Sequence, residues 1–133
     1  MSSLANRPEC YDQAAIRHFD DAEHLASNQR WNGAAHLIGF AAECALKYAI
    51  ASLRPDQDVP HRHIPELLSI ARKHLQQQNH RGLYALIGQA DYFADWTVND
   101  RYSADSAISP SSYELWRSHA RRTIGAAGLR RTP

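Results

Sequence analysis

An arginine and two aromatic residues in one turn are the side chains of this sequence best suited to bind a ligand. Trp96, Arg101 and Tyr102 lie in the stretch WTVNDRYSAD, residues 96–105. A planar guanidinium binds phosphate and an aromatic ring stacks on a base, so the turn could contact RNA or a nucleotide. In the alternative interpretation, Arg101 pairs with a core carboxylate such as Glu43, while Trp96 and Tyr102 close the end of a helical domain. By residue type alone, this structural role is the commoner one.

Histidines form the second group of candidate residues. His61 and His63 lie two residues apart at a loop-to-helix junction, and two such histidines can bind one metal ion. A helix-entry cluster is the commoner role, and we expect neither a metal site nor a cofactor. The sequence contains no HExxH or ExxH pair, no phosphate-binding glycine loop and no dinucleotide-binding motif. Its Ser, His and Asp residues show no spacing typical of a catalytic triad.

The longest apolar stretch, residues 31–53, must position any site. Its apolar residues recur at helical spacing around most of the circumference, which predicts a helix inside a bundle. Many of these residues are Ala or Gly, so neighbouring helices can approach closely. A narrow polar stripe remains at His36, Glu43 and Lys47. Glu43 precedes Lys47 by four residues, the favourable order for a helix ion pair.

Other segments also have helical patterns. Three of them are residues 9–27, a segment that begins at Pro65 and a segment from Leu83 to about Tyr92. The last helix follows Pro110, and Ser111 and Glu114 form a capping box at its start. Residues 93–110 are rich in Asp, Ser and aromatic residues and are expected to be irregular. No alternating strand pattern occurs. We therefore predict an all-α, up-and-down bundle of four to five helices.

Length, composition and charge limit the classes of protein to which the chain can belong. It has 133 residues, of which 44% are hydrophobic and 22% charged, and a net charge of +1 with His neutral. These values predict one globular domain, 1–133, with its core at about 9–129 and loose ends at 1–8 and 130–133. The charge gives no general attraction to nucleic acid or membrane. No signal peptide or uninterrupted membrane span is evident and the two cysteines share no motif, so we expect a cytoplasmic protein.

Four pieces of the sequence, in order, resemble the HEPN domain, a helical-bundle family of prokaryotes and higher eukaryotes. AEHLASNQRWNGAAHLIGFAAECALKYAI looks like the first helical hairpin of the family, with Glu43 and Lys47 at its recurrent A-E-x-x-L-K positions. HRHIPELL resembles the T-H-D-L-x-x-L-L helix entry, with His63 at the family's His position. WTVNDRYS resembles the W-x-x-x-x-R-Y turn of one HEPN branch, and the closing amphipathic helix is in the matching place. The resemblance spans about residues 12–129.

The resemblance implies a bundle of four or five helices that forms a homodimer. Many HEPN domains are metal-independent ribonucleases of toxin–antitoxin and defence systems, whereas others are non-catalytic and some pair with a small nucleotidyltransferase. The ribonuclease members carry R-x4–6-H near the start of a late helix. Here Tyr102 and Ser103 follow Arg101, and the next His after them is His119, so the sequence departs from that motif.

Three hypotheses follow for the function. In the first, the chain is a HEPN-like module without the standard ribonuclease site, which binds RNA, a nucleotide, an antitoxin or a nucleotidyltransferase near Arg101, Tyr102, Lys47, Glu43 and His63. In the second, it is a metal-independent ribonuclease in which Arg101 acts with His63 or His36. In the third, it is a structural dimerisation protein.

Overall fold

The chain folds as a bundle of helices, which confirms the predicted all-α class. The computed structural model describes residues 9–53, 55, 58–76 and 80–129, and these ranges contain no strand. The expected loose ends lie outside the described residues. The elements in chain order are α1 Tyr11–Ser27, α2 Trp31–Leu53, α3 Glu66–His74, α4 Arg81–Ile87, the 3₁₀ helices η3 Val98–Tyr102 and η4 Asp105–Ala107, and α5 Pro110–Ala126.

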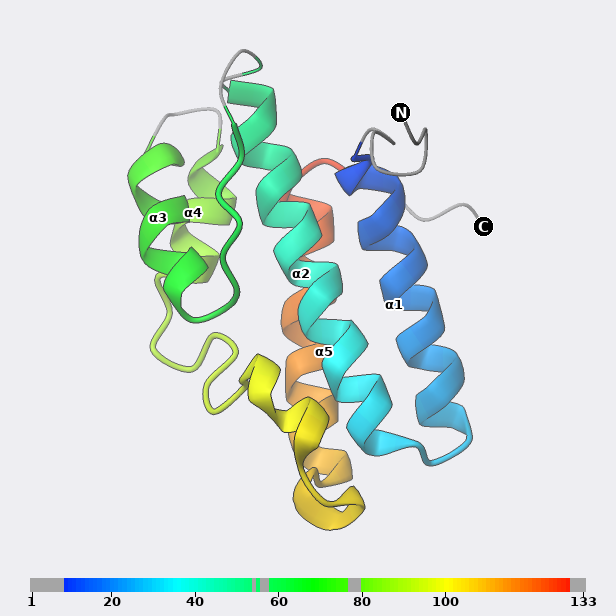
Figure 1. The fold of residues 1–133 in the computed structure, drawn as a ribbon. Helices are drawn as coiled ribbons and strands as arrows, with labels where there is room; N and C mark the ends of the chain where they lie inside the picture. Colours follow the sequence, from blue (N-terminus) through cyan, green and yellow to red (C-terminus); the bar gives the residue numbers. More distant parts are fainter. Residues whose placement is uncertain (1–8, 54, 56–57, 77–79, 130–133) are drawn as a thin grey trace, which may run out of the picture.

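Helix α2 lies at the centre of the bundle, between α1 on one side and α3 and α4 on the other (Figure 1). It packs most extensively against α1 and α5, and α3, η3 and η4 also contact it. A tight corner at residues 28–30 makes α1 and α2 antiparallel (Figure 1). After α2 the chain runs back along this helix before α3 begins, and residues 58–65 therefore reach the middle of α2.

Small side chains on α2 allow its neighbours to pack closely, as the sequence predicted. Ala34, Ala41 and Ala45 have no exposed surface, and Phe19 of α1 and Tyr113 of α5 are buried in the same core. Burial of such apolar surface is the main source of stability, at about 25 cal/mol per Å². Helix α2 is therefore a rigid base for the polar side chains that it carries.

The start of α5 differs from the prediction. Ser109 caps the helix, because its Oγ accepts a hydrogen bond from the Ser112 backbone N–H at 3.1 Å. Pro110 occupies the first turn of α5. Backbone N–H groups have no partner within the helix there, so the N–H that proline lacks is not needed. The predicted capping box of Ser111 and Glu114 is therefore wrong, since the helix begins two residues earlier than that motif requires.

The chain between α4 and α5 is more ordered than expected. Helix α4 ends at Ile87 rather than near Tyr92, and turns follow it. The stretch expected to be irregular contains η3 and η4, which both pack on α2. These two short helices bring the Arg101 turn onto the central helix.

Helix α2 is long and apolar enough, by length and composition, to cross a membrane. Of its most apolar window, 61% is buried inside the protein. The core helix of a bundle has the same composition, so the location in the cytoplasm stays a prediction.

Candidate functional site

Glu43 is a buried carboxylate that holds the loop before α3 onto the middle of α2. Its side chain is 4% exposed, and its two oxygens lie 2.9 and 3.0 Å from Nδ1 of His63. The backbone N–H of Ile64 donates to the same carboxylate at 3.1 Å. Burial raises the pKa of Glu43, and the hydrogen bonds from His63 and Ile64 work in the opposite direction. Glu43 thus joins two segments that are twenty residues apart in the sequence.

The expected ion pair between Glu43 and Lys47 does not form. The Lys47 ammonium instead lies 6.0 Å from the centre of the Tyr11 ring, on the side of α1. Its charge still favours the ionised form of Glu43 and so lowers the pKa of that group. Lys47 therefore acts on Glu43 at a distance, and it is not joined to it.

His63 uses only one of its two ring nitrogens, Nδ1, in the pair with Glu43. When Glu43 is ionised its carboxylate can only accept, and Nδ1 of His63 then donates and leaves Nε2 as the acceptor in the neutral ring. The side chain is 48% exposed, and its ring is stacked on Phe40 with centroids 5.6 Å apart. A buried carboxylate that fixes a half-exposed imidazole in one tautomer is an arrangement used for acid–base chemistry.

His36 lies one helical turn before Phe40 and also contacts its ring. The two ring centroids are 4.4 Å apart. Nδ1 of His36 is buried and has no hydrogen-bond partner in the described part of the chain. Burial lowers the pKa of His36, and the positive charges of Arg101 and His63 lower it further. The Phe40 ring contacts both His36 and His63, and the charge of Arg101 acts on His36, so we call these three residues the histidine–arginine cluster.

Arg101 and Tyr102 are at the surface of this cluster. The guanidinium lies over the Tyr102 ring, 4.6 Å from its centroid, and donates a hydrogen bond to the Val98 carbonyl at 3.4 Å. Tyr102 is 79% exposed. Among the described residues no carboxylate pairs with Arg101, and Glu43 is taken by His63. The interpretation in which Arg101 links the bundle through Glu43 is therefore wrong.

Trp96 has a structural role and offers no stacking surface to a ligand. It is 4% exposed, and its indole N–H donates to the Ala35 carbonyl of α2 at 2.7 Å. Its ring covers Gly39, where an added Cβ would lie 2.0 Å from a ring carbon. The prediction that Trp96 stacks on a base is wrong for this reason. The indole instead fixes the segment that carries Arg101 against α2.

Two ring residues of the site were missed in the sequence. Phe40 contacts both His36 and His63, and His18 of α1 lies edge-on to it at 5.9 Å. The signal was present, because Phe40 follows His36 by four residues and therefore shares its face of α2. Burial lowers the pKa of His18, and Arg17 and His36 lower it further, while Asp21 opposes them.

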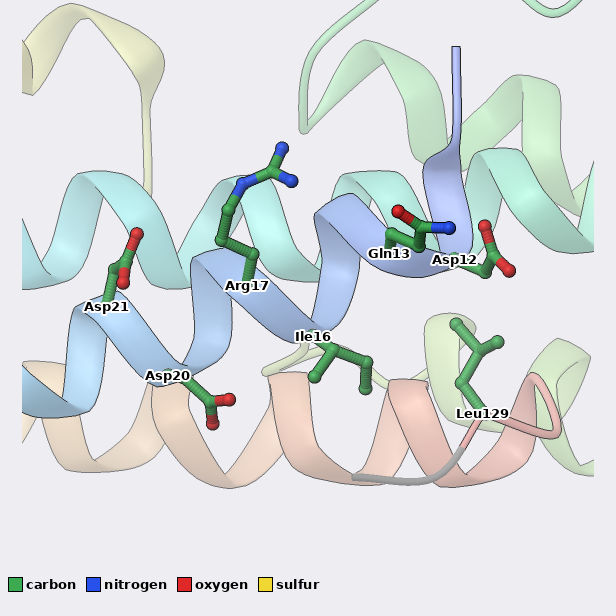
Figure 2. Close-up of a pocket in the computed structure, with 7 residues that line it drawn as sticks. All are labelled: Asp12, Gln13, Ile16, Arg17, Asp20, Asp21 and Leu129. Atoms are coloured by element: carbon green, nitrogen blue, oxygen red, sulfur yellow. The ribbon is translucent and has the colours of Figure 1, made fainter. Parts of the chain in front are cut away.

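No three His, Cys, Asp or Glu side chains of the described residues are grouped in a way that could hold a metal ion. A hollow of about 540 Å³ lies between α1 and the end of α5 (Figure 2). Ile16 and Leu129 approach each other in it, and Asp12 and Asp21 line its edge (Figure 2). Its charged lining residues are three aspartates, with Asp20 the third, and one arginine, Arg17, so the lining carries net negative charge and opposes an anionic ligand.

Comparison with known protein families, with characterised proteins and with solved structures gives no match for this chain. The resemblance to HEPN domains therefore stays a prediction from the four sequence pieces.

Proposed function

We propose that the chain is a HEPN-like helical module that binds RNA through the histidine–arginine cluster and Tyr102. The observation that carries the proposal is an Arg101 guanidinium that no described carboxylate neutralises, held on an exposed tyrosine ring and near enough to His36 for its charge to act on that group. Arg101 is exposed, so its guanidinium is accessible to a phosphate group, whose charge and shape it complements.

Each side chain has a defined task in this proposal. Arg101 donates two parallel hydrogen bonds to a phosphate, which its planar fork favours over a single bond. Tyr102 stacks on an adjacent base, and such stacking contributes about 1–3 kcal/mol per base. His36 becomes easier to protonate when the phosphate offsets the charge of Arg101.

The biological setting follows from the resemblance alone. We propose a homodimer in the cytoplasm that acts in a toxin–antitoxin or other defence system, with an antitoxin or a small nucleotidyltransferase as partner. A protein that forms dimers but binds neither RNA nor such a partner would instead be a structural dimerisation protein.

The test is the affinity for fluorescently labelled single-stranded RNA, measured by anisotropy over a series of salt concentrations. Arg101→Ala should weaken binding about 10-fold and reduce the slope of log K against log salt by about 0.7–1. Tyr102→Ala should weaken binding with an unchanged slope. Arg121→Ala removes an exposed arginine of α5 and serves as the matched control. If Arg101→Ala and Arg121→Ala have equal effects, RNA does not bind at the cluster.

The Glu43–His63 pair favours a second candidate function, metal-independent cleavage of RNA. Nε2 of His63 would take the proton of a 2′-hydroxyl, and the 2′-oxygen would attack the phosphorus that Arg101 holds. Protonated His36 would give a proton to the departing 5′-oxygen, which leaves a 2′,3′-cyclic phosphate and a 5′-hydroxyl. Cleavage in EDTA that is lost in His63→Ala and reduced in Glu43→Gln would support this function. Cleavage at the same rate in both variants would exclude it.

A further inference from the structure

A second hollow, of about 470 Å³, lies where the corner between α1 and α2 meets η4. Arg30 lines it from the corner, Trp31 and Asn32 from the first turn of α2, and Asp105 from η4. It therefore lies on the same side of α2 as the chain that follows Tyr102. A volume of a few hundred Å³ suits one small ligand.

Trp31 differs from the other two tryptophans of the chain. The indole N–H of Trp96 donates to Ala35, and that of Trp116 donates to the Ala94 carbonyl at 2.9 Å. Trp31 is only half-buried, and its N–H has no partner within the described ranges. Its ring lies near that of Tyr113, tilted by 51°, with centroids 5.7 Å apart. Trp31 is thus an aromatic surface with an unused donor at the edge of a hollow.

Arg30 and Asp105 bring opposite charges to the same hollow without neutralising each other. Both side chains are exposed, and neither has an ion pair or a hydrogen bond to another side chain in the part of the chain that the structure describes. Two oppositely charged groups that face one hollow without pairing can each bind a different group of one ligand.

Asn32 makes the wall of the hollow rigid. Its side-chain N–H group donates to the carbonyls of Ser103 and Ala104, at 3.3 and 3.2 Å. These bonds fix the chain between Tyr102 and Asp105 on the first turn of α2. The hollow and the histidine–arginine cluster are therefore joined by one short, anchored segment.

We infer that this hollow binds a guanine base. The face of Trp31 stacks on the purine ring, and the two oxygens of Asp105 accept from its two adjacent N–H donors, the ring N1–H and the exocyclic amino group. Adenine offers only one amino donor and a ring acceptor at that edge, so a carboxylate discriminates against it. Arg30 binds the phosphate of the same nucleotide. The inference deepens the proposed function and rests on it, because it names the base that accompanies an RNA phosphate at Arg101.

Tryptophan fluorescence tests the inference directly, because Trp31 is the half-buried tryptophan while Trp96 and Trp116 are 4% and 3% exposed. Guanosine monophosphate (GMP) should bind the wild-type protein and quench its fluorescence. Adenosine monophosphate should bind with about 10-fold lower affinity. Trp31→Phe should abolish the quenching while circular dichroism shows an intact fold. Asp105→Asn should remove the preference for guanine. Asp95→Asn, an exposed aspartate outside the hollow, is the matched control.

The outcomes separate this inference from the proposed function. Equal affinity for the two nucleotides, or quenching that survives in Trp31→Phe, would overturn the guanine site. Arg101→Ala should leave the affinity for GMP unchanged while it weakens the binding of RNA. If GMP binds through Trp31 but Arg101→Ala does not affect RNA, the proposed phosphate site is wrong and the hollow stands.

Discussion

Substitution of Gly39 by alanine should damage the contact that places Arg101 on the central helix. An added Cβ would lie 2.0 Å and 2.1 Å from two ring carbons of Trp96, and 2.5 Å from its indole nitrogen. Real Cβ atoms do not approach other atoms so closely, so the indole must move away from α2. That movement breaks its 2.7 Å hydrogen bond to Ala35.

The size of the effect is the sum of three contributions. Overpacking a well-packed site costs about 1–3 kcal/mol. A buried donor without its acceptor costs about 1–3 kcal/mol more. The better helix propensity of alanine stabilises the variant by about 1 kcal/mol. Gly39→Ala should therefore lower the free energy of unfolding by about 1–5 kcal/mol.

Urea denaturation followed by circular dichroism measures this change. Gly125 provides a matched control, because it lies in α5 and an added Cβ would meet no atom of the described residues within 4 Å. Gly125→Ala should stabilise the protein by up to about 1 kcal/mol, so the same substitution should have opposite signs at the two sites. If Gly39→Ala is as stable as Gly125→Ala, the contact between Trp96 and α2 is not as tight as described.

Two further predictions concern the last helix. His119 is buried, its Nδ1 accepts from the Phe93 N–H at 3.1 Å, and burial lowers its pKa. The unfolded chain therefore binds a proton that the folded chain does not, so the free energy of unfolding should fall as the pH drops below about 6.5. The urea midpoint should follow this fall, and His119→Asn should make the midpoint depend less on pH. A wild-type midpoint that rises between pH 7 and pH 5 would contradict the role of His119. Ser109→Ala should cost about 0.5–2 kcal/mol in the same assay, whereas Ser111→Ala should change stability by less than about 0.5 kcal/mol. Equal losses in the two serine variants would mean that Ser109 is not the cap.

The sequence predicts the elements of this fold better than it predicts their contacts. Apolar spacing identified α1 and the whole of α2, because a helix buried on most sides needs a long run of small and apolar residues. The start of α5 was misplaced, since Ser109 and Ser111 both fit a cap and only the backbone decides between them. Local patterns determine where helices form, whereas one residue decides where each begins.

The candidate site was found in part, for a physical reason. Residue type and resemblance indicate Arg101, His36 and His63, and the structure brings the two histidines onto the Phe40 ring, with the charge of Arg101 acting on His36. Their partners were not predictable, because Glu43 and His63 are far apart in sequence and meet only through the loop that runs back along α2. An aromatic residue in a polar turn predicts a ligand contact at Trp96, yet its ring fits the gap that Gly39 leaves.

In the proposed function, an RNA phosphate binds at the histidine–arginine cluster. The most direct test is a proton NMR titration of the histidine ring signals with and without single-stranded RNA, with His36 assigned through a His36→Gln variant. Burial and Arg101 lower the pKa of His36 in the free protein, and a bound phosphate should raise it. In Arg101→Ala the added RNA should shift this pKa less. RNA that binds while the pKa of His36 stays the same would contradict the claim.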